Sequence, residues 1–215
     1  MPNRKVLRAA AEGRRQQRKS ARRLYRRHRE QVPALIRQLG GPTQADHDRA
    51  FDLLSRMGAT VVSELLEALS DPSVDGVVAD EVVSLLGLTG QERARAPLWG
   101  FFQANRDDPE RASTAALSLA GQGDARVLPY VRKALEAADE ELVSNAAAAM
   151  IVLGELEDVD RLRAVHRRHL INQEIRVGVA NAILTILGET DETMFNRTLD
   201  EIRTSSVDRV LWTDI

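Results

Sequence analysis

Paired basic residues recur every four positions near the N-terminus, and their side chains could bind phosphate or carboxylate groups. The pairs occupy positions 14/15, 18/19, 22/23 and 26/27 within the stretch RRQQRKSARRLYRRHR. Such a stripe of positive charge can bind a nucleic-acid backbone by releasing counterions, or attract an acidic protein surface by electrostatic steering. The pattern therefore predicts recognition of an anionic surface. The candidate binding residues are Arg14, Arg15, Arg18, Lys19, Arg22, Arg23, Arg26 and Arg27, together with Leu24 and Tyr25.

Residue types that could carry out catalysis form no recognisable constellation in the sequence. The absence of cysteine excludes disulfides and thiolate metal sites. Two of the four histidines, His166 and His169, are three positions apart, but a zinc site uses three or four ligands. The sequence contains neither a phosphate-binding glycine loop nor a nucleophile elbow. We therefore expect no catalytic residues, no metal and no cofactor.

Positive charge is concentrated at one end of the chain. The formal net charge of the 215 residues is −2, but residues 1–31 hold 12 basic and 2 acidic residues, a balance of +10. The remainder carries −12, so a basic arm precedes an acidic body. No stretch approaches the roughly 20 apolar residues of a membrane-spanning helix. The basic start also lacks the apolar core of a secretory signal, and we expect a cytoplasmic location.

The basic arm has the pattern of an amphipathic helix with a narrow apolar seam. At 100° per residue, the basic pairs cover about 220° of a helix circumference. We expect this helix to end just before Pro33. Gly13 and like charges four residues apart oppose helix formation in a free arm, so a partner or the acidic body must order it. The remaining arc holds Val6, Ala10, Ala21, Leu24 and His28, with Leu7 and Tyr25 at its edge.

The rest of the chain contains a repeat whose units end in an apolar run and a glycine. The glycines are Gly58, Gly87, Gly121, Gly154 and Gly188, spaced by 29, 34, 33 and 34 residues. A glycine after a periodic apolar run predicts a helix C-cap in the left-handed conformation. Eight residues before each glycine stands a small residue, and four residues before it stands an apolar one. This spacing predicts one buried face on the helix that precedes each glycine.

Between successive glycines there is room for two helices. Candidate N-caps begin the second helix of each pair, and proline follows two of them in the favoured first-turn position. The predicted unit is therefore helix, short turn, helix and glycine. The candidate N-caps are Asp71, Asp108, Asp139 and Asn172, and the prolines are Pro72 and Pro109.

These paired helices with an aspartate-led turn and LG endings resemble HEAT repeats of the short bacterial, PBS-lyase-like type. Such repeats often carry a proline in the first helix, as at Pro97 and Pro129, and an arginine after the aspartate, as at Arg111 and Arg176. The resemblance implies an all-α fold, an α-solenoid of about five helical hairpins. It divides the chain into the arm 1–32, the solenoid 33–204 and a C-terminal cap 205–215 containing Trp212.

In such an array the second helices line the concave face, and the positions seven and three residues before each glycine should face outward. They form a stripe of short polar groups with few charges, unlike the clustered basic and aromatic residues of a nucleic-acid groove. The stripe predicts a protein or peptide partner, or a solvated face with no ligand. Its candidate residues are Asp80, Ser84, Thr114, Ser118, Asn181 and Thr185.

Enzymes of this repeat class provide a comparison for function. The di-iron hydroxylases use His-Glu ligands, and here no histidine precedes glutamate. The DNA glycosylases need aromatic and acidic groups on a basic channel, but PLWGFF, with Trp99, is typical of a helix core. Nothing singles out a bilin lyase.

The sequence thus predicts a non-catalytic adaptor that binds a protein with an acidic surface. The alternative is a nucleic-acid- or ribosome-associated factor that uses the arm to contact RNA or DNA. Anionic lipid is disfavoured, because the seam lacks bulky inserting residues.

Overall fold

The computed structural model describes residues 4–169 and 171–188, with side chains from Glu12 onward. The described chain consists of α-helices and short 3-10 turns without strands, so the predicted all-α class is confirmed. The chain divides into two compact units, Met1–Gly100 and Phe101–Ile215, called unit 1 and unit 2 below. The predicted cap at 205–215 lies outside the described residues.

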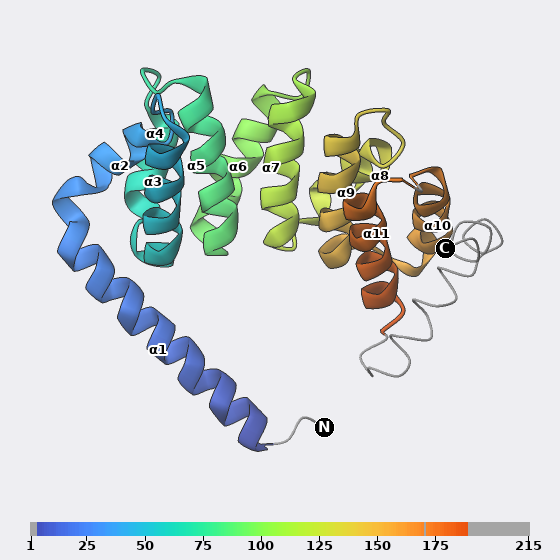
Figure 1. Ribbon diagram of the computed structural model, residues 1–215, viewed down its shortest axis with the longest axis horizontal. Helices are drawn as coiled ribbons and strands as arrows, with labels where there is room; N and C mark the ends of the chain where they lie inside the picture. Colours follow the sequence, from blue (N-terminus) through green and yellow to red (C-terminus); the bar gives the residue numbers. More distant parts are fainter. Residues whose placement is uncertain (1–3, 170, 189–215) are drawn as a thin grey trace. The chain divides into compact units, whose positions relative to one another are not determined.

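Unit 1 contains a long first helix and pairs of shorter helices (Figure 1). The helix α2 packs against α3, α4 packs against α5, and α3 also contacts α5. Figure 1 shows α1 projecting away from these helices beyond its contact with them. The elements are α1 (Arg4–His28), η1 (Arg29–Gln31), α2 (Val32–Gln38), α3 (Gln44–Met57), η2 (Gly58–Thr60), α4 (Val62–Ser70), α5 (Gly76–Thr89) and α6 (Glu92–Ala104), which crosses into unit 2.

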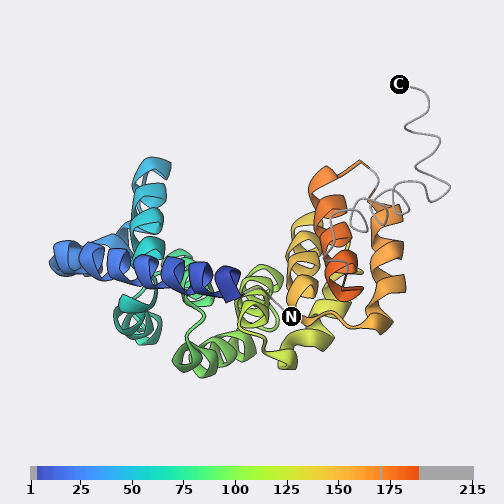
Figure 2. The same cartoon turned by 90° about the horizontal axis from the view of Figure 1, so that it is seen from below.

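In unit 2, alternate helices pack on one another: α7 packs on α9, and α9 packs on α11. The helix α9 contacts both α7 and α11, while α8 packs on α9 and α10 packs on α11 (Figure 2). The small residues at the predicted contact positions, Ser113, Ala146 and Ala180, are each buried, so helices approach closely there. The elements are α7 (Pro109–Gly121), η3 (Ala125–Val127), α8 (Leu128–Ala134), α9 (Glu140–Leu153), η4 (Leu156–Asp158), α10 (Val159–Arg168) and α11 (Gln173–Ile186).

The N-caps follow the prediction at three of four helices. Asp108, Asp139 and Asn172 cap α7, α9 and α11, and each side chain accepts hydrogen bonds from backbone N–H groups of the first turn. The prediction is wrong at Asp71, which ends α4 and instead accepts hydrogen bonds from the N–H and hydroxyl of Ser73. Asp75 caps α5, because the aspartate-proline-serine turn displaces the helix start by four residues.

The glycine C-caps are confirmed in part. Gly58 and Gly188 adopt positive φ values of 51° and 71° at the ends of α3 and α11. Gly87 is instead inside α5, which continues to Thr89 and ends at Gly90 with φ 59°. Gly121 is the last residue of α7, and the left-handed residue is Gly123.

Gly154 caps α9 with an extended conformation, φ −64° and ψ 144°. A Cβ added there would lie 2.5 Å from Ile186 Cδ1 and 2.6 Å from the Met150 carbonyl oxygen. Glycine is therefore required here because the last turn of α9 and the Ile186 side chain leave no room for a Cβ, and not because the backbone is left-handed.

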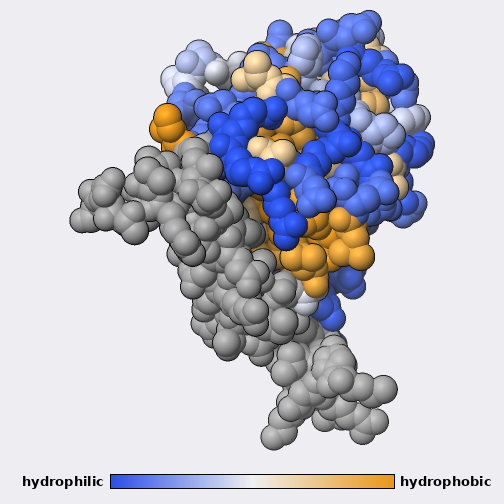
Figure 3. Space-filling view, turned by 90° about the vertical axis from the view of Figure 1, so that its right-hand side faces the viewer, coloured by the Kyte–Doolittle hydropathy of each residue, from blue (hydrophilic) through white to orange (hydrophobic). Residues whose placement is uncertain are grey.

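Unit 2 exposes several large apolar side chains. Figure 3 shows hydrophobic residues gathered at part of a surface that is otherwise mostly hydrophilic. Three of the exposed apolar side chains are Val152, Leu156 and Leu187, which lie within two residues of Gly154 or Ile186 in the sequence. Ile171 and Val177 are also exposed, on the loop before α11 and on α11 itself.

Candidate binding arm and groove

The predicted seam of α1 is the face that meets the rest of unit 1. From Glu12 to Glu30 all side chains are exposed except Ala21, Leu24, Tyr25 and His28, which are half-buried. Their spacing of three, one and three residues places them on one helix face. The C-terminal half of α1 contacts α3 and η2. Leu24 and Tyr25, predicted to bind a partner, therefore also hold the arm against its own body.

A hydrogen bond between helices secures this contact. The Tyr25 hydroxyl donates to Glu64 Oε1 on α4 at 2.5 Å. The hydrogen bond to the Glu64 carboxylate raises the pKa of Tyr25, and burial and the carboxylate charge act in the same direction. Arg29 acts in the opposite direction but does not reverse the shift. The neutral phenol is thus the form that holds α1 to α4.

The eight predicted basic side chains of the arm make no ion pair with the described residues. This holds for all eight predicted members between Arg14 and Arg27, all of which are exposed. Elsewhere basic side chains find carboxylates: Arg56 pairs with Asp52 at 3.1 Å, and Arg161 with Glu136 at 3.0 Å. The arm therefore keeps its positive charge available to a partner.

An open groove runs between α1 and the C-terminal end of α3, with a volume of about 990 Å³. The turn at Gly58 forms the second wall, because its positive φ redirects the chain from α3 into η2. The Thr60 hydroxyl donates to the Met57 carbonyl oxygen at 2.7 Å and fixes this turn. The lining residues on this side are Ser55, Arg56, Met57, Gly58, Ala59 and Thr60, with Gln91 nearby.

The groove is strongly basic. Arg18, Arg22, Arg23 and Arg27 line it from α1, and Arg56 lines it from α3. No carboxylate is among its lining residues, and only Arg56 has a carboxylate partner. The carbonyl end of α3 carries partial negative charge, which favours arginines at this place but neutralises only part of their charge. An anionic group would find several guanidinium groups here.

The sequence did not predict this groove. It marked Gly58 as a helix end and the arginines as an arm, but the contact of α1 with α3 depends on tertiary packing. The apolar seam was the available signal, since it required a surface to pack against.

The six predicted concave-face residues belong to different units, Asp80 and Ser84 to unit 1 and the others to unit 2. Three hydroxyls bond within their own helices. Ser84 donates to the Asp80 carbonyl, Thr114 to that of Glu110 and Thr185 to that of Asn181. These back-bonded hydroxyls need no ligand.

The prediction that this column faces outward is wrong at Ser118, which is 7% exposed. At this position α7 lies between α8 and α9, and Ser118 is enclosed by the packed helices although Thr185, at the equivalent position of α11, is exposed. Asp80, Ser84, Thr114 and Asn181 are half-buried, and Thr185 is exposed.

A second cluster of charges in unit 2 is internally paired. Arg132 on α8 donates to both oxygens of Asp158 in η4 at 2.8 and 3.0 Å, and it also contacts Glu155 and Glu157. Asp158 is 1% exposed. Burial alone would raise its pKa, but hydrogen bonds from Arg132 and from the Glu155 N–H lower it overall. With its charges compensated in this way, the cluster links α8 to the following hairpin.

The histidines lie in separate environments. His47 contacts Asp48 and Glu81, each at 3.2 Å, His166 is buried, and His169 lies 3.7 Å from Glu140. In the part of the chain that the structure describes, no three His, Cys, Asp or Glu side chains are grouped so that they could hold a metal ion.

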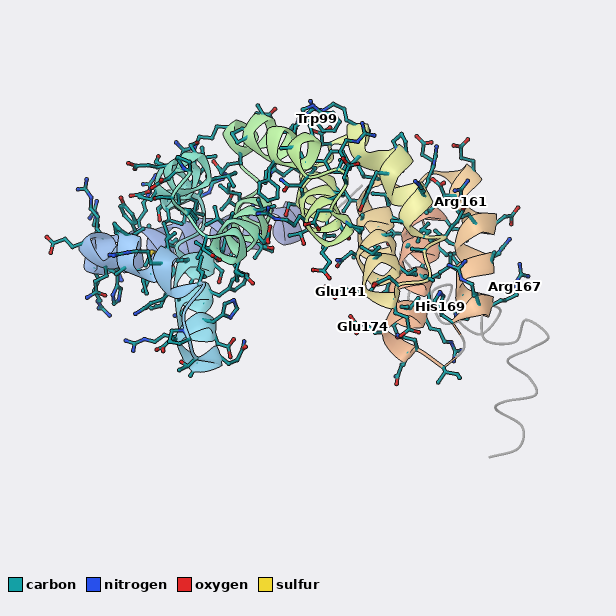
Figure 4. All side chains as sticks on the ribbon, turned by 90° about the horizontal axis from the view of Figure 1, so that it is seen from above. Trp99, Glu141, Arg161, Arg167, His169 and Glu174 are labelled. Atoms are coloured by element: carbon teal, nitrogen blue, oxygen red, sulfur yellow. The ribbon has the colours of Figure 1, made fainter. Side chains whose placement is uncertain are left out.

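The stretch around Trp99 has the predicted core character. Leu98 and Phe102 are buried, and Trp99 on α6 is half-buried. In Figure 4, Arg161 and Arg167 extend outward from α10, and Glu141 and Glu174 lie at the starts of α9 and α11.

Comparison with protein-family models finds no family that matches this chain, and comparison with curated proteins finds no similar sequence. Within residues 4–169 and 171–188, no helix is both long enough and apolar enough to cross a membrane.

Proposed function

We propose that this protein is a non-catalytic adaptor of the HEAT-repeat type, in which a helical solenoid carries a basic arm that binds an acidic surface of a partner protein. The arm is α1, and its binding residues are the exposed basic side chains between Arg14 and Arg27.

The solenoid assignment is supported by the order of helix contacts inside each unit. The sequence neighbours α2 and α3, α4 and α5, α8 and α9, and α10 and α11 pack together. In unit 2 the second helix of one pair also packs on the second helix of the next, as in α7, α9 and α11. Ion pairs also join successive hairpins, as between Arg132 and Asp158. In a repeat protein each unit is stabilised by its neighbours in this way.

The observation that carries the proposed function is the contrast between the two faces of α1. One face is fixed to unit 1 by the seam and by Tyr25, while the rest of the circumference presents eight basic side chains that pair with no described residue, four of them along the groove beside α3. Such a charge array accelerates encounter with an oppositely charged partner and orients it, and the fixed helix preserves the geometry.

The proposal is tested by isolating the intact chain from its own cells at moderate salt, identifying the proteins that accompany it, and repeating the binding with the purified partner. R15E/R22E should weaken that binding by about tenfold or more. K133E/R167E, which makes the same charge change at exposed positions of unit 2, should leave it nearly unchanged. Recovery of RNA or DNA alone would contradict the proposal and favour the nucleic-acid alternative.

A further inference from the structure

We propose that the groove between α1 and the α3–η2 turn is the seat for an acidic amphipathic helix of the partner protein. The inference rests on the proposed function and adds the place and the chemistry of recognition. The partner helix would present carboxylates to the arginines at the edges of the groove, which we call its rim. It would present one or two apolar side chains to the surface around Ala21, Leu24 and Ala59, which we call its floor.

On its α1 side the groove carries guanidinium groups that pair with no carboxylate of the described residues. Arg18, Arg22 and Arg27 recur at four- and five-residue spacing along α1, and Arg56 lies on the opposite wall. Carboxylates spaced by three or four residues on a partner helix would meet this row, since helical side chains at that spacing share a face.

The floor favours a protein segment over a nucleic acid. Ala21, Leu24 and Ala59 present apolar surface to the groove above the fully buried Met57, and no aromatic ring is among its lining residues. Single-stranded nucleic acids bind by stacking bases on aromatic side chains within a basic groove. A duplex presents phosphates and would leave the apolar floor without a partner. An amphipathic helix matches both the floor and the rim.

The size of the groove also fits. A helix with its side chains is about 10–12 Å across and rises 5.4 Å per turn, so about 990 Å³ holds roughly two turns. Two turns bring an apolar residue and the one four positions later onto the floor, with acidic residues on either side. A short acidic anchor of this kind is therefore the expected occupant.

The test uses a fluorescent helical peptide of about 14 residues, with leucines at i and i+4 flanked by glutamates. A scrambled peptide of the same composition provides the sequence control, and a single-stranded oligouridylate provides the nucleic-acid control. Fluorescence anisotropy with the intact chain should give the tightest binding for the patterned peptide. Two kinds of variant then distinguish the groove from the remainder of the arm.

The first kind changes charge. R22E/R27E replaces two groove arginines, and R15E/R26E makes the same change on α1 outside the groove lining. The groove pair should weaken peptide binding at least about fivefold more than the other pair. Equal losses from the two pairs would overturn the inference, because they would show a general attraction to the arm.

The second kind fills the groove without changing charge. Ala59 is exposed in η2 and lines the groove, so A59W should weaken binding of the patterned peptide by about tenfold. A164W adds the same indole on the exposed side of α10 and should have little effect. Circular dichroism and thermal unfolding verify that each variant is folded.

Unchanged peptide binding by folded A59W, or tighter binding of oligouridylate than of the peptide, would overturn the inference. The same variants distinguish failure of the groove inference from failure of the proposed function. If binding of the purified natural partner is lost in R15E/R22E but kept in A59W, the adaptor function stands and the groove is excluded as the seat. If R15E/R22E also keeps that partner, the proposed function itself fails.

Discussion

Gly121 and Gly154 end equivalent helices, yet their surroundings impose different demands. A Cβ at Gly154 would collide with Ile186 and with the Met150 carbonyl, whereas nothing lies within 4 Å of a Cβ built at Gly121. We expect G154A to lower the free energy of unfolding by about 2 kcal/mol, because the added Cβ meets the backbone carbonyl of Met150 in the last turn of α9 and displaces the Ile186 side chain of α11.

G121A is the matched control for this prediction. It should be neutral or stabilising by up to about 0.5 kcal/mol, since alanine restricts the unfolded chain more than glycine does. Urea unfolding followed by circular dichroism measures both values. An equal cost for the two substitutions would show that the crowding around Gly154 does not require glycine there.

Arg132 compensates a carboxylate that has almost no access to water. R132M leaves Asp158 buried without its guanidinium partner, and we expect the free energy of unfolding to fall by about 3 kcal/mol near neutral pH. R163M removes a surface pair with Asp160 on α10 and should cost less than about 0.5 kcal/mol.

The loss in R132M should depend on pH in a defined direction. The pKa of Asp158 in the folded protein lies below its ordinary value of 3.8, so this group stabilises the fold above that value. That stabilisation is lost as pH falls through the lowered folded pKa. Without Arg132, burial dominates and raises the folded pKa. Wild type and R132M should therefore converge in stability below about pH 4, as unfolding series at several pH values would measure. A constant difference at all pH values would contradict this account.

The contact of α1 with the rest of unit 1 depends on the half-buried face of α1 that contains Leu24 and Tyr25. Y25F removes the hydrogen bond to Glu64 but keeps the ring, so the cost should be about 1 kcal/mol. Hydrogen exchange should become faster for the backbone amides of the last two turns of α1, while exchange in α9 and α11 stays unchanged.

Y130F provides the control for Y25F. Tyr130 donates to the Pro109 carbonyl oxygen at 3.2 Å within unit 2, so its removal should leave exchange in α1 unaffected. If Y25F also left α1 unchanged, the apolar seam alone would hold the arm.

The elements that local chemistry determines could be predicted from the sequence, and those that depend on distant residues could not. Asp108 and Asp139 cap helices through hydrogen bonds to residues two or three positions away. The seam of α1 follows from helical periodicity alone. Asp71 was assigned wrongly because two aspartates four residues apart both suit a cap, and the turn at Ser73 selects between them.

The groove between α1 and α3 is one of the features that depend on distant residues. The arginines of α1 were predicted as binding residues, but Arg56 and Ala59 become part of the same surface only when α3 and η2 meet α1. Ser118 is a similar case, because its burial depends on tertiary packing of α7 that the repeat pattern does not encode.

Charge is segregated along the whole chain, and this predicts a dependence of self-association on salt. An arm of +10 and a body of −12 nearly cancel, which favours attraction between copies when ionic screening is weak. Light scattering should show the apparent mass of the intact chain rising below about 50 mM salt and returning to its original value when salt is added.

Two variants with equal net charge test whether the arrangement of charge is responsible. R14E/R15E and K133E/R167E each reverse two basic residues and change the formal net charge from −2 to −6. The arm variant weakens the segregation and should associate less at low salt than the body variant, which strengthens it. Identical behaviour would show that net charge alone governs association.

If the proposed function holds, the length of α1 beyond its docked half would separate first contact with the partner from its final binding in the groove. From Ala21 back to Arg4 the helix extends roughly 25 Å at 1.5 Å per residue. This distance exceeds the screening length of about 8 Å at physiological salt, so the outer arginines can attract an acidic surface that the body does not yet influence. In the proposed adaptor, the projecting half would thereby enlarge the volume within which the partner is attracted.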